Sequence, residues 1–213
     1  MSFVLFLLLG CDAGETPCRE GTSLHEDGHC YPPLLEFPPL LDDAVAALPE
    51  CEPVDGGEEH VIDIARGCAS GACADDTFVE MVEALGDEVV CVTTTFDNKQ
   101  VYCTWEALGV DGLFLDDDRD TVPDANRRTD RIHLFPPYPG STADGVGIGA
   151  NVSCFIDSLG HPDRMVVYDV GGELMVRDLL YDQYGLSAYD QGTDDESGLP
   201  NGYVDNMYLY GAP

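Results

Sequence analysis

The feature that most constrains this fold is a pattern that recurs after about 75 residues along the chain. The matching pairs are Leu85-Gly86 with Leu159-Gly160, Gly109 with Gly185, Pro123-Asp124 with Pro200-Asn201, and residues 130–135 with residues 205–210. Self-similarity at a fixed period is typical of tandem copies of one structural unit. We therefore predict two tandem repeats, residues 58–138 and residues 139–213.

Each predicted repeat begins with a helix. In the first repeat Asp75 or Asp76 can cap the helix and Gly86 can end it, whereas Asn151 and Gly160 take these roles in the second. Between cap and glycine, apolar residues recur at helical spacing. These stripes are Phe78, Met81, Val82 and Leu85 in the first repeat, and Val152, Phe155, Ile156 and Leu159 in the second.

Four short strands are predicted after each helix, because runs rich in β-branched and aromatic residues alternate there with turn residues. They are residues 88–94, 100–106, 110–115 and 131–135 in the first repeat, and residues 164–169, 173–180, 186–189 and 203–210 in the second. The sequence thus predicts an α+β fold, in which each repeat is a helix followed by a roughly four-stranded antiparallel sheet.

The first ten residues predict a signal peptide. Residues 3–9 are wholly apolar, and a run of this length is too short to span a bilayer but fits a secretory leader. Gly10-Cys11 resembles a bacterial lipobox, which implies cleavage before Cys11 and its lipidation; the alternative is a buried strand with an ordinary cysteine. Residues 11–57, rich in Pro and Gly, are then a lipidated tether. We expect a protein of the bacterial cell envelope that faces the periplasm or the cell exterior.

The cysteines predict a disulfide framework. The chain has nine, and a lipidated Cys11 leaves an even number, as expected in an oxidising compartment. We predict a small loop closed by Cys18 and Cys30, and a bridge between Cys91 and Cys103, which lie equally far from the turn of the first hairpin. The spacing leaves the partners of four residues open: Cys51, Cys68, Cys73 and Cys154. For Cys68 and Cys73 half of a zinc site is an alternative, although no matching Cys or His pair follows.

The charge is strongly acidic, with 41 Asp and Glu residues against nine Lys and Arg residues. Such a surface repels phosphates, so we expect no nucleic acid partner and membrane contact through the lipid anchor only. Because acidic residues are spread over the whole chain, adaptation to salt is the favoured explanation.

One acidic stretch suggests a metal. Asp116, Asp118, Asp120 and Asp124 occupy positions 1, 3, 5 and 9 of a calcium loop. Thr121 replaces the usual glycine, and Arg127 stands where a closing carboxylate is expected, so a solvated acidic loop is the alternative. The segment of residues 116–126 also resembles a thrombospondin type 3 calcium repeat. Calcium is the one cofactor that the sequence suggests.

A tandem of helix-plus-sheet units with a disulfide across an early hairpin resembles the β-lactamase inhibitory proteins, and a single unit is similar to the BamE (SmpA/OmlA) outer-membrane lipoproteins. The resemblance implies a binding or assembly module with an envelope protein partner. Tyrosines are enriched at recognition surfaces, and the second repeat offers a candidate set: Tyr181, Tyr184, Tyr189, Tyr203, Tyr208 and Tyr210. The alternative for half of these rings is a place in the core, because strand side chains alternate between the two faces.

The sequence holds no catalytic motif that we can assign, and it lacks the Gly-x-Ser-x-Gly elbow of many hydrolases. We therefore expect a non-enzymatic protein. An extracytoplasmic hydrolase is the alternative, because catalytic groups can assemble from distant residues.

Overall fold

The computed structural model describes residues 23–24, 30–31, 48, 50–57, 59–94, 99–116, 122–170, 173–189 and 202–210. The chain divides into two units, Met1–Glu36 and Phe37–Pro213. In the first unit, β1 (Ser23–Leu24) and β2 (Cys30–Tyr31) pair in antiparallel fashion. The predicted signal peptide, Cys11 and Cys18 lie outside the described residues. The elements that follow belong to the second unit.

A small sheet begins the second unit. Its strands β3 (Ile62–Asp63), β4 (Cys68–Ala69) and β5 (Ala72–Cys73) are antiparallel, and the short 3-10 helix η1 (Ile64–Arg66) joins the first two. Ser70 and Gly71 connect β4 to β5 with φ angles of 51° and 86°. A two-residue hairpin turn favours such left-handed conformations, because they match the twist of the strands.

Two helices of eight residues follow the pattern predicted from the sequence, α2 (Phe78–Leu85) and α3 (Val152–Leu159). Asn151 caps α3 as predicted, since its side chain accepts a hydrogen bond from the Cys154 backbone N–H. The cap of α2 is Thr77 rather than Asp75 or Asp76. Thr77 and Glu80 form a reciprocal capping box, with each side chain accepting from the other residue's backbone N–H.

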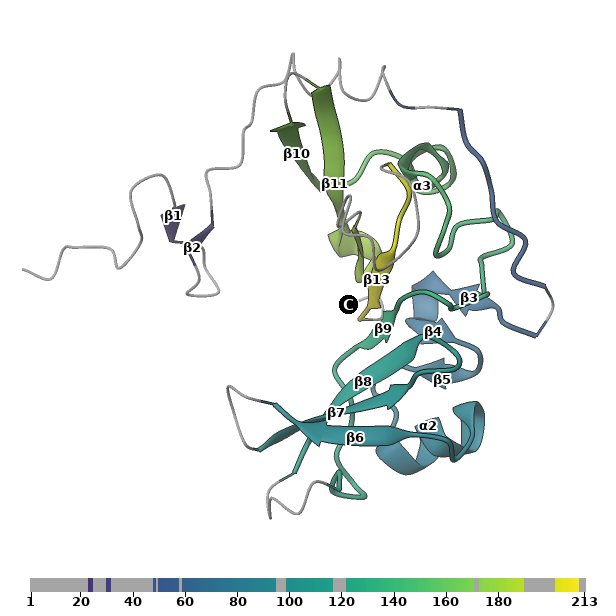
Figure 1. Cartoon of the computed structure of the whole chain (residues 1–213), viewed down its shortest axis with the longest axis vertical. Coiled ribbons are helices and arrows are strands. Elements are labelled where there is room, and N and C mark those ends of the chain that lie inside the picture. The colour runs from purple at the N-terminus through teal and green to yellow at the C-terminus, as the bar shows by residue number, and fades with distance from the viewer. Residues whose placement is uncertain are drawn as a thin grey trace, which may run out of the picture. The chain divides into compact units, whose positions relative to one another are not determined.

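The main sheet has eight antiparallel strands in the order β10-β11-β12-β13-β9-β8-β7-β6 (Figure 1). Strands β9 and β13 pair with each other at the centre, with His133 opposite Tyr208. The strand bounds are β6 (Val90–Thr93), β7 (Gln100–Trp105), β8 (Val110–Leu115), β9 (Ile132–Leu134), β10 (Arg164–Val170), β11 (Glu173–Tyr181), β12 (Leu186–Tyr189) and β13 (Asn206–Leu209). A second 3-10 helix, η2 (Asp182–Tyr184), joins β11 to β12.

The predicted fold class is wrong. The structure is mostly β, with a three-stranded and an eight-stranded sheet and only two short helices in the described part of the second unit. It is therefore not an α+β fold of two tandem repeats that each carry a sheet of their own. The boundary expected between two repeats near residue 138 is not observed. The pairing of β9 with β13 joins strands β6–β9 and strands β10–β13 into one continuous sheet. The three-stranded sheet was missed altogether, since strands of two residues show no alternation.

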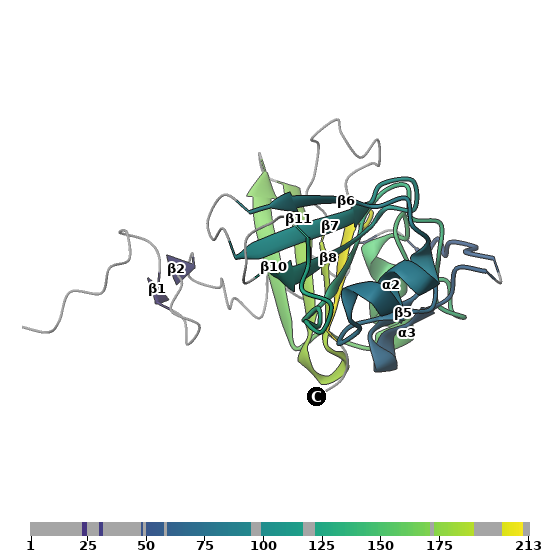
Figure 2. The ribbon, with the colours of Figure 1, turned by 90° about the horizontal axis from the view of Figure 1, so that it is seen from below.

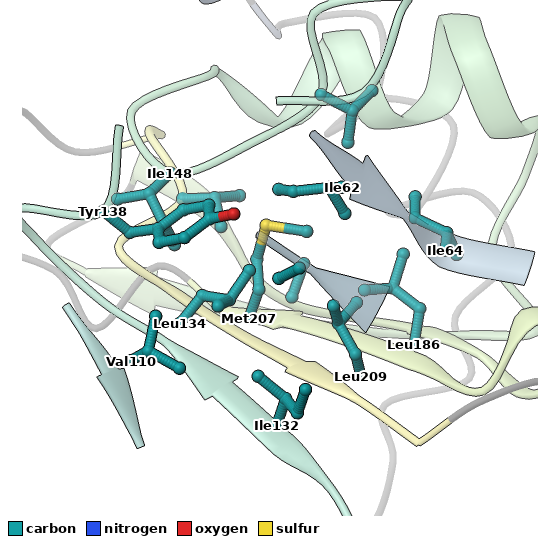
Figure 3. Packing of buried hydrophobic residues seen from close by; sticks show 14 of the residues in the cluster. Ile62, Ile64, Val110, Ile132, Leu134, Tyr138, Ile148, Leu186, Met207 and Leu209 are labelled. Carbon is teal, nitrogen blue, oxygen red and sulfur yellow. The ribbon is translucent and has the colours of Figure 1, made fainter. Parts of the chain in front are cut away.

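One hydrophobic core lies between the two sheets and the helices. Ile62 and Ile64 from the region of the small sheet face Leu134, Met207 and Leu209 of the main sheet (Figure 3). Burial of these side chains supplies the main favourable term in folding. Figures 1 and 2 show that α2, α3 and the small sheet lie on the same side of the main sheet. No helix among the described residues is long and apolar enough to cross a membrane.

The opposite side of the main sheet is covered by no other described element of the second unit, and we call it the open face. Strand side chains alternate between the two sides, and cross-strand partners share a side. Burial alternates accordingly in β7, β8, β9 and β13. The open face therefore carries Val90, Val92, Tyr102, Thr104, Asp111, Leu113, Leu115, Arg131, His133, Ser187, Tyr189, Asn206, Tyr208 and Tyr210.

Three disulfides join cysteines of the described residues. The predicted Cys91–Cys103 bridge is present across the β6–β7 hairpin. Cys68 bonds to Cys73, which rules out the zinc alternative for this pair, and Cys51 bonds to Cys154 at a sequence separation of 103 residues. Disulfides of this kind persist in oxidising surroundings, so they indicate an extracytoplasmic location. The predicted Cys18–Cys30 bridge involves a residue outside the described ones.

Candidate functional site: an aromatic cluster on the open face

The centre of the open face is built by three neighbouring strands. The register places Asp111 of β8 opposite His133 of β9, and His133 opposite Tyr208 of β13. Ser187 of β12 is the next partner of Tyr208. Alternation in each strand points these side chains away from the core, because Ile132, Leu134, Met207 and Leu209 point into it. The Tyr208 cluster, as we name it, comprises Tyr102, Asp111, Arg131, His133, Tyr189, Asn206, Tyr208 and Tyr210.

His133 lies between two hydrogen-bond acceptors. Its Nδ1 is 2.7 Å from Asp111 Oδ2, and its Nε2 is 2.7 Å from Asn206 Oδ1. The amide of Asn206 is oriented by its Nδ2, which donates to Asp205 Oδ1 at 2.8 Å. These contacts hold the ring in one orientation, and 15% of its side chain remains exposed.

The ring of Tyr208 is packed on several sides. His133 stacks on it with ring centroids 4.3 Å apart and planes inclined by 7°. Tyr189 meets it edge-on at 5.5 Å, and Tyr210 lies at 6.5 Å with nearly parallel planes. Burial, and after it the negative charge of Asp111, raises the pKa of the Tyr208 hydroxyl to about 12. The cluster is thus a packed set of rings at the surface of the sheet.

Arg131 connects Tyr208 to Tyr102 of strand β7. Its guanidinium carbon lies 5.4 Å from the centroid of the Tyr208 ring, within the range of a cation–π contact. Its Nη2 donates to the hydroxyl oxygen of Tyr102 at 3.2 Å. Arg131 gives the centre of the open face a cationic group, in a chain whose formal net charge is −32.

The six tyrosines predicted as a binding surface do not lie together. Tyr189, Tyr208 and Tyr210 belong to the cluster, and Tyr210 is 41% exposed. Tyr181 is fully buried in the core, where its hydroxyl donates to the Gly160 carbonyl oxygen. Tyr184 packs against Tyr181, and Tyr203 donates to Glu52 Oε2 at 2.7 Å. Tyr181 is therefore no surface residue, whereas three of the six tyrosines share the open face.

Sequence reasoning missed Tyr102, Asp111, Arg131, His133 and Asn206. A signal was available, because residues 130–135 and residues 205–210 share one alternating pattern. With Ile132, Leu134, Met207 and Leu209 in the core, the positions between them must face outward together. What the pattern does not show is that these two segments pair with each other.

The predicted calcium loop lies partly outside the described residues, which include neither Asp118 nor Asp120. Asp116 is fully buried at the end of β8, and its backbone N–H donates to the Lys99 carbonyl oxygen. Asp124 forms an ion pair with Arg127 at 3.9 Å. Among the described residues no group of three or more His, Cys, Asp or Glu side chains could hold a metal ion. Calcium binding stays a prediction.

A second polar group joins the small sheet to the loop after β9. Ser70 Oγ is 3.1 Å from His60 Nδ1 and 3.0 Å from the Tyr138 hydroxyl oxygen. Gly140 permits this packing, because a Cβ there would lie 2.1 Å from the His60 carbonyl oxygen and 2.5 Å from the Tyr138 ring. The left-handed φ of Ser70 belongs to the hairpin turn. The group holds the turn in place.

Comparisons with protein-family models, with curated proteins and with solved structures find no match to this chain.

Proposed function

We propose that this protein is an exported, lipid-anchored envelope protein that binds a protein partner through the open face of its eight-stranded sheet and performs no catalysis. The observation that carries this proposal is the Tyr208 cluster on a sheet face that no other described element of the second unit covers. Tyrosine and arginine dominate the binding energy of many protein interfaces. Rings already held by His133 and Arg131 lose little conformational entropy on binding.

The site geometry supports binding rather than proton transfer. A general base needs a free nitrogen within reach of the proton that it removes. Both ring nitrogens of His133 are instead occupied by Asp111 and Asn206. The arrangement therefore fixes a ring against Tyr208 instead of activating a nucleophile.

The test of the open face is capture of a partner by the mature chain carrying Cys11→Ser, followed by binding measurements with the purified partner. Arg131→Ala and Tyr210→Ala should each weaken that binding at least tenfold, as expected of residues at the centre of an interface. Val79→Ala is the matched control, because Val79 on α2 is 48% exposed and Tyr210 is 41% exposed. Equal affinity for all variants would contradict the proposal.

The lipid anchor is tested separately. Cys11 is the predicted acylation site, and Cys11→Ser should move the protein from the membrane fraction to the soluble fraction. Labelling with a radioactive fatty acid should mark the wild type and leave the variant unlabelled. An unlabelled wild type would remove the anchor from the proposal and leave the open-face part standing.

A second candidate, an extracytoplasmic hydrolase, has one observation in its favour, the 3.1 Å contact between Ser70 Oγ and His60 Nδ1. A nucleophilic serine beside its base is the arrangement that acyl transfer uses. The nearby depression, lined by Val61 and residues 53–57 and 141–145, adds two titratable groups, Asp55 and Asp144, and both are exposed. A fluorophosphonate probe that labels the wild type but not Ser70→Ala would establish this candidate, and an unlabelled wild type would remove it.

A further inference from the structure

Strand β6 forms one margin of the eight-stranded sheet. It pairs with β7 on one side, and no other described strand of the second unit pairs with its other side (Figure 1). A free margin of this kind presents unpaired backbone N–H and C=O groups, which can pair with another chain.

The register identifies which groups of β6 point outward. Thr94, just after β6, donates its backbone N–H to the Gln100 carbonyl oxygen at 2.8 Å, so this pair is hydrogen bonded. Cys91 and Cys103 have Cα atoms 4.1 Å apart, the short spacing of a pair that is not hydrogen bonded. Since the two kinds of pair alternate, Val90 and Val92 bond to β7. Cys91 and Thr93 therefore turn their N–H and C=O groups to the free margin.

The side chains of β6 also suit a docking strand. Val90 and Val92 lie on the open face and are 62% and 55% exposed. The strand contains no charged residue and no proline. The Cys91–Cys103 disulfide ties β6 to β7, so the margin is held in an extended conformation before any partner arrives.

The other margin of the sheet, β10, is built differently. Its pairing with β11 is irregular between Val166 and Val167, and its sequence includes Arg164 and Asp169. Natural sheets use bulges and charged residues to protect their edges from unwanted pairing. In this sheet β10 carries such protection, and β6 does not.

We propose that the free margin of β6 is a docking site for an extended peptide segment of a partner protein, which adds to the sheet as a ninth strand. The outward groups of Cys91 and Thr93 pair with its backbone, and apolar side chains at alternate positions pack beside Val90 and Val92. Asp87 and Glu88, both exposed, precede β6 in a chain of net charge −32. The segment therefore carries Lys or Arg at its ends. A second copy of the chain would instead bring like charges together.

The probe is the acetylated and amidated peptide Lys-Val-Thr-Val-Thr-Val-Lys, added to the isotope-labelled mature chain carrying Cys11→Ser. On titration, hydrogen exchange of the Cys91 and Thr93 amides should slow at least tenfold, whereas the Val90 and Val92 amides are already protected by β7. The same peptide with its five central residues N-methylated keeps its side chains and lacks the N–H donors, so it should bind at least tenfold more weakly. Unchanged exchange at Cys91 and Thr93 with millimolar peptide would overturn the proposal.

Two variants separate docking from folding. Thr93→Pro removes an outward N–H that the β6–β7 ladder does not use, and Pro is tolerated at such positions of edge strands. Val92→Lys keeps the backbone intact but adds an edge charge that repels the peptide's lysines. Each should weaken peptide binding at least tenfold, with Val79→Lys on α2 as the matched control that leaves it unchanged. The proposal would be overturned if Val92→Lys and the wild type bound the peptide equally well. It would also be overturned if the Cys91 amide were protected from exchange only under conditions in which sedimentation shows the chain to be a dimer.

Discussion

On the open face, Tyr208 is the residue whose side-chain properties are changed most by its neighbours. Its ring is covered by His133 and Tyr189, and Arg131 lies within 5.4 Å of its centroid. Burial withdraws the hydroxyl from water, so its ionised form is disfavoured and its pKa rises to about 12.

Replacing Tyr208 by Phe should change how stability depends on alkaline pH. The raised pKa favours the protonated hydroxyl in the folded state, so its contribution is complete below pH 10 and is lost as the pH rises toward 12. Chemical denaturation between pH 9 and pH 12 should therefore show a shallower loss of unfolding free energy for Tyr208→Phe than for the wild type. Tyr210→Phe, at the exposed end of the cluster, is the control. Equal slopes for the wild type and Tyr208→Phe would show that the ring is solvated.

Among the elements, α2 depends on its first turn. It spans only eight residues, a length at which an isolated helix is marginal, and Thr77 with Glu80 satisfies its first backbone donors. Thr77→Ala should lower the unfolding free energy by about 1 kcal/mol, the usual cost of losing such a cap. Thr77→Ser keeps the oxygen and should cost less than half as much. If Thr77→Ala left the unfolding free energy in urea unchanged, packing alone would hold α2 in place.

The stabilisation that each disulfide contributes should increase with the length of chain between its two cysteines. Cys51–Cys154 spans 103 residues, Cys91–Cys103 spans 12 and Cys68–Cys73 spans 5. Loop-closure entropy then predicts that a double Cys→Ser replacement costs about 5 kcal/mol for the first pair and about 2 kcal/mol for the last. Denaturant unfolding of the three double variants measures this order. A loss at Cys68–Cys73 equal to that at Cys51–Cys154 would assign the effect to local packing.

At the scale of single elements, the sequence predicts most helices and strands of the second unit near their observed bounds, because alternation, helical spacing and caps are local signals. The Cys91–Cys103 bridge was predictable for the same reason, since a hairpin turn sets the register of its two strands. Cys51 and Cys154 have no such local relation. Their pairing depends on Cys51 lying beside α3, where Asn151 Nδ2 donates to the carbonyl oxygen of the adjacent Glu50.

For the whole molecule, charge opposes compactness. A formal net charge of −32 in a folded chain repels itself, and added salt weakens that repulsion as the Debye length falls from about 10 Å at 0.1 M to about 3 Å at 1 M. The unfolding free energy should rise steadily over this range of sodium chloride. The salt dependence should be smaller for the triple variant Glu83→Gln, Glu88→Gln, Glu106→Gln, whose three sites are exposed. A stability that is flat with salt would contradict the explanation of the acidic composition as salt adaptation.

The predicted fold class failed at this same scale. Local patterns show which side of a strand faces the core, but they do not show which strand lies beside it. Two groups of four strands could form two sheets or one, and the pairing of Met207 with Leu134 and of Tyr208 with His133 decides for one. Burial of the whole core selects that pairing, and the pattern of any single segment does not contain it.

By itself, the sequence determined three local features. Side chains alternate between the core and the open face along residues 131–135 and 206–210, the β6–β7 hairpin carries its disulfide, and Asn151 caps α3. Only the tertiary structure decided that Asp111, His133 and Tyr208 meet on neighbouring strands, that Tyr181 enters the core, and that β6 is left at a margin. The physical reason is that turns and helix caps form between residues close in the chain. Strand order is instead set by contacts between residues far apart, which compete with one another until the whole core is packed.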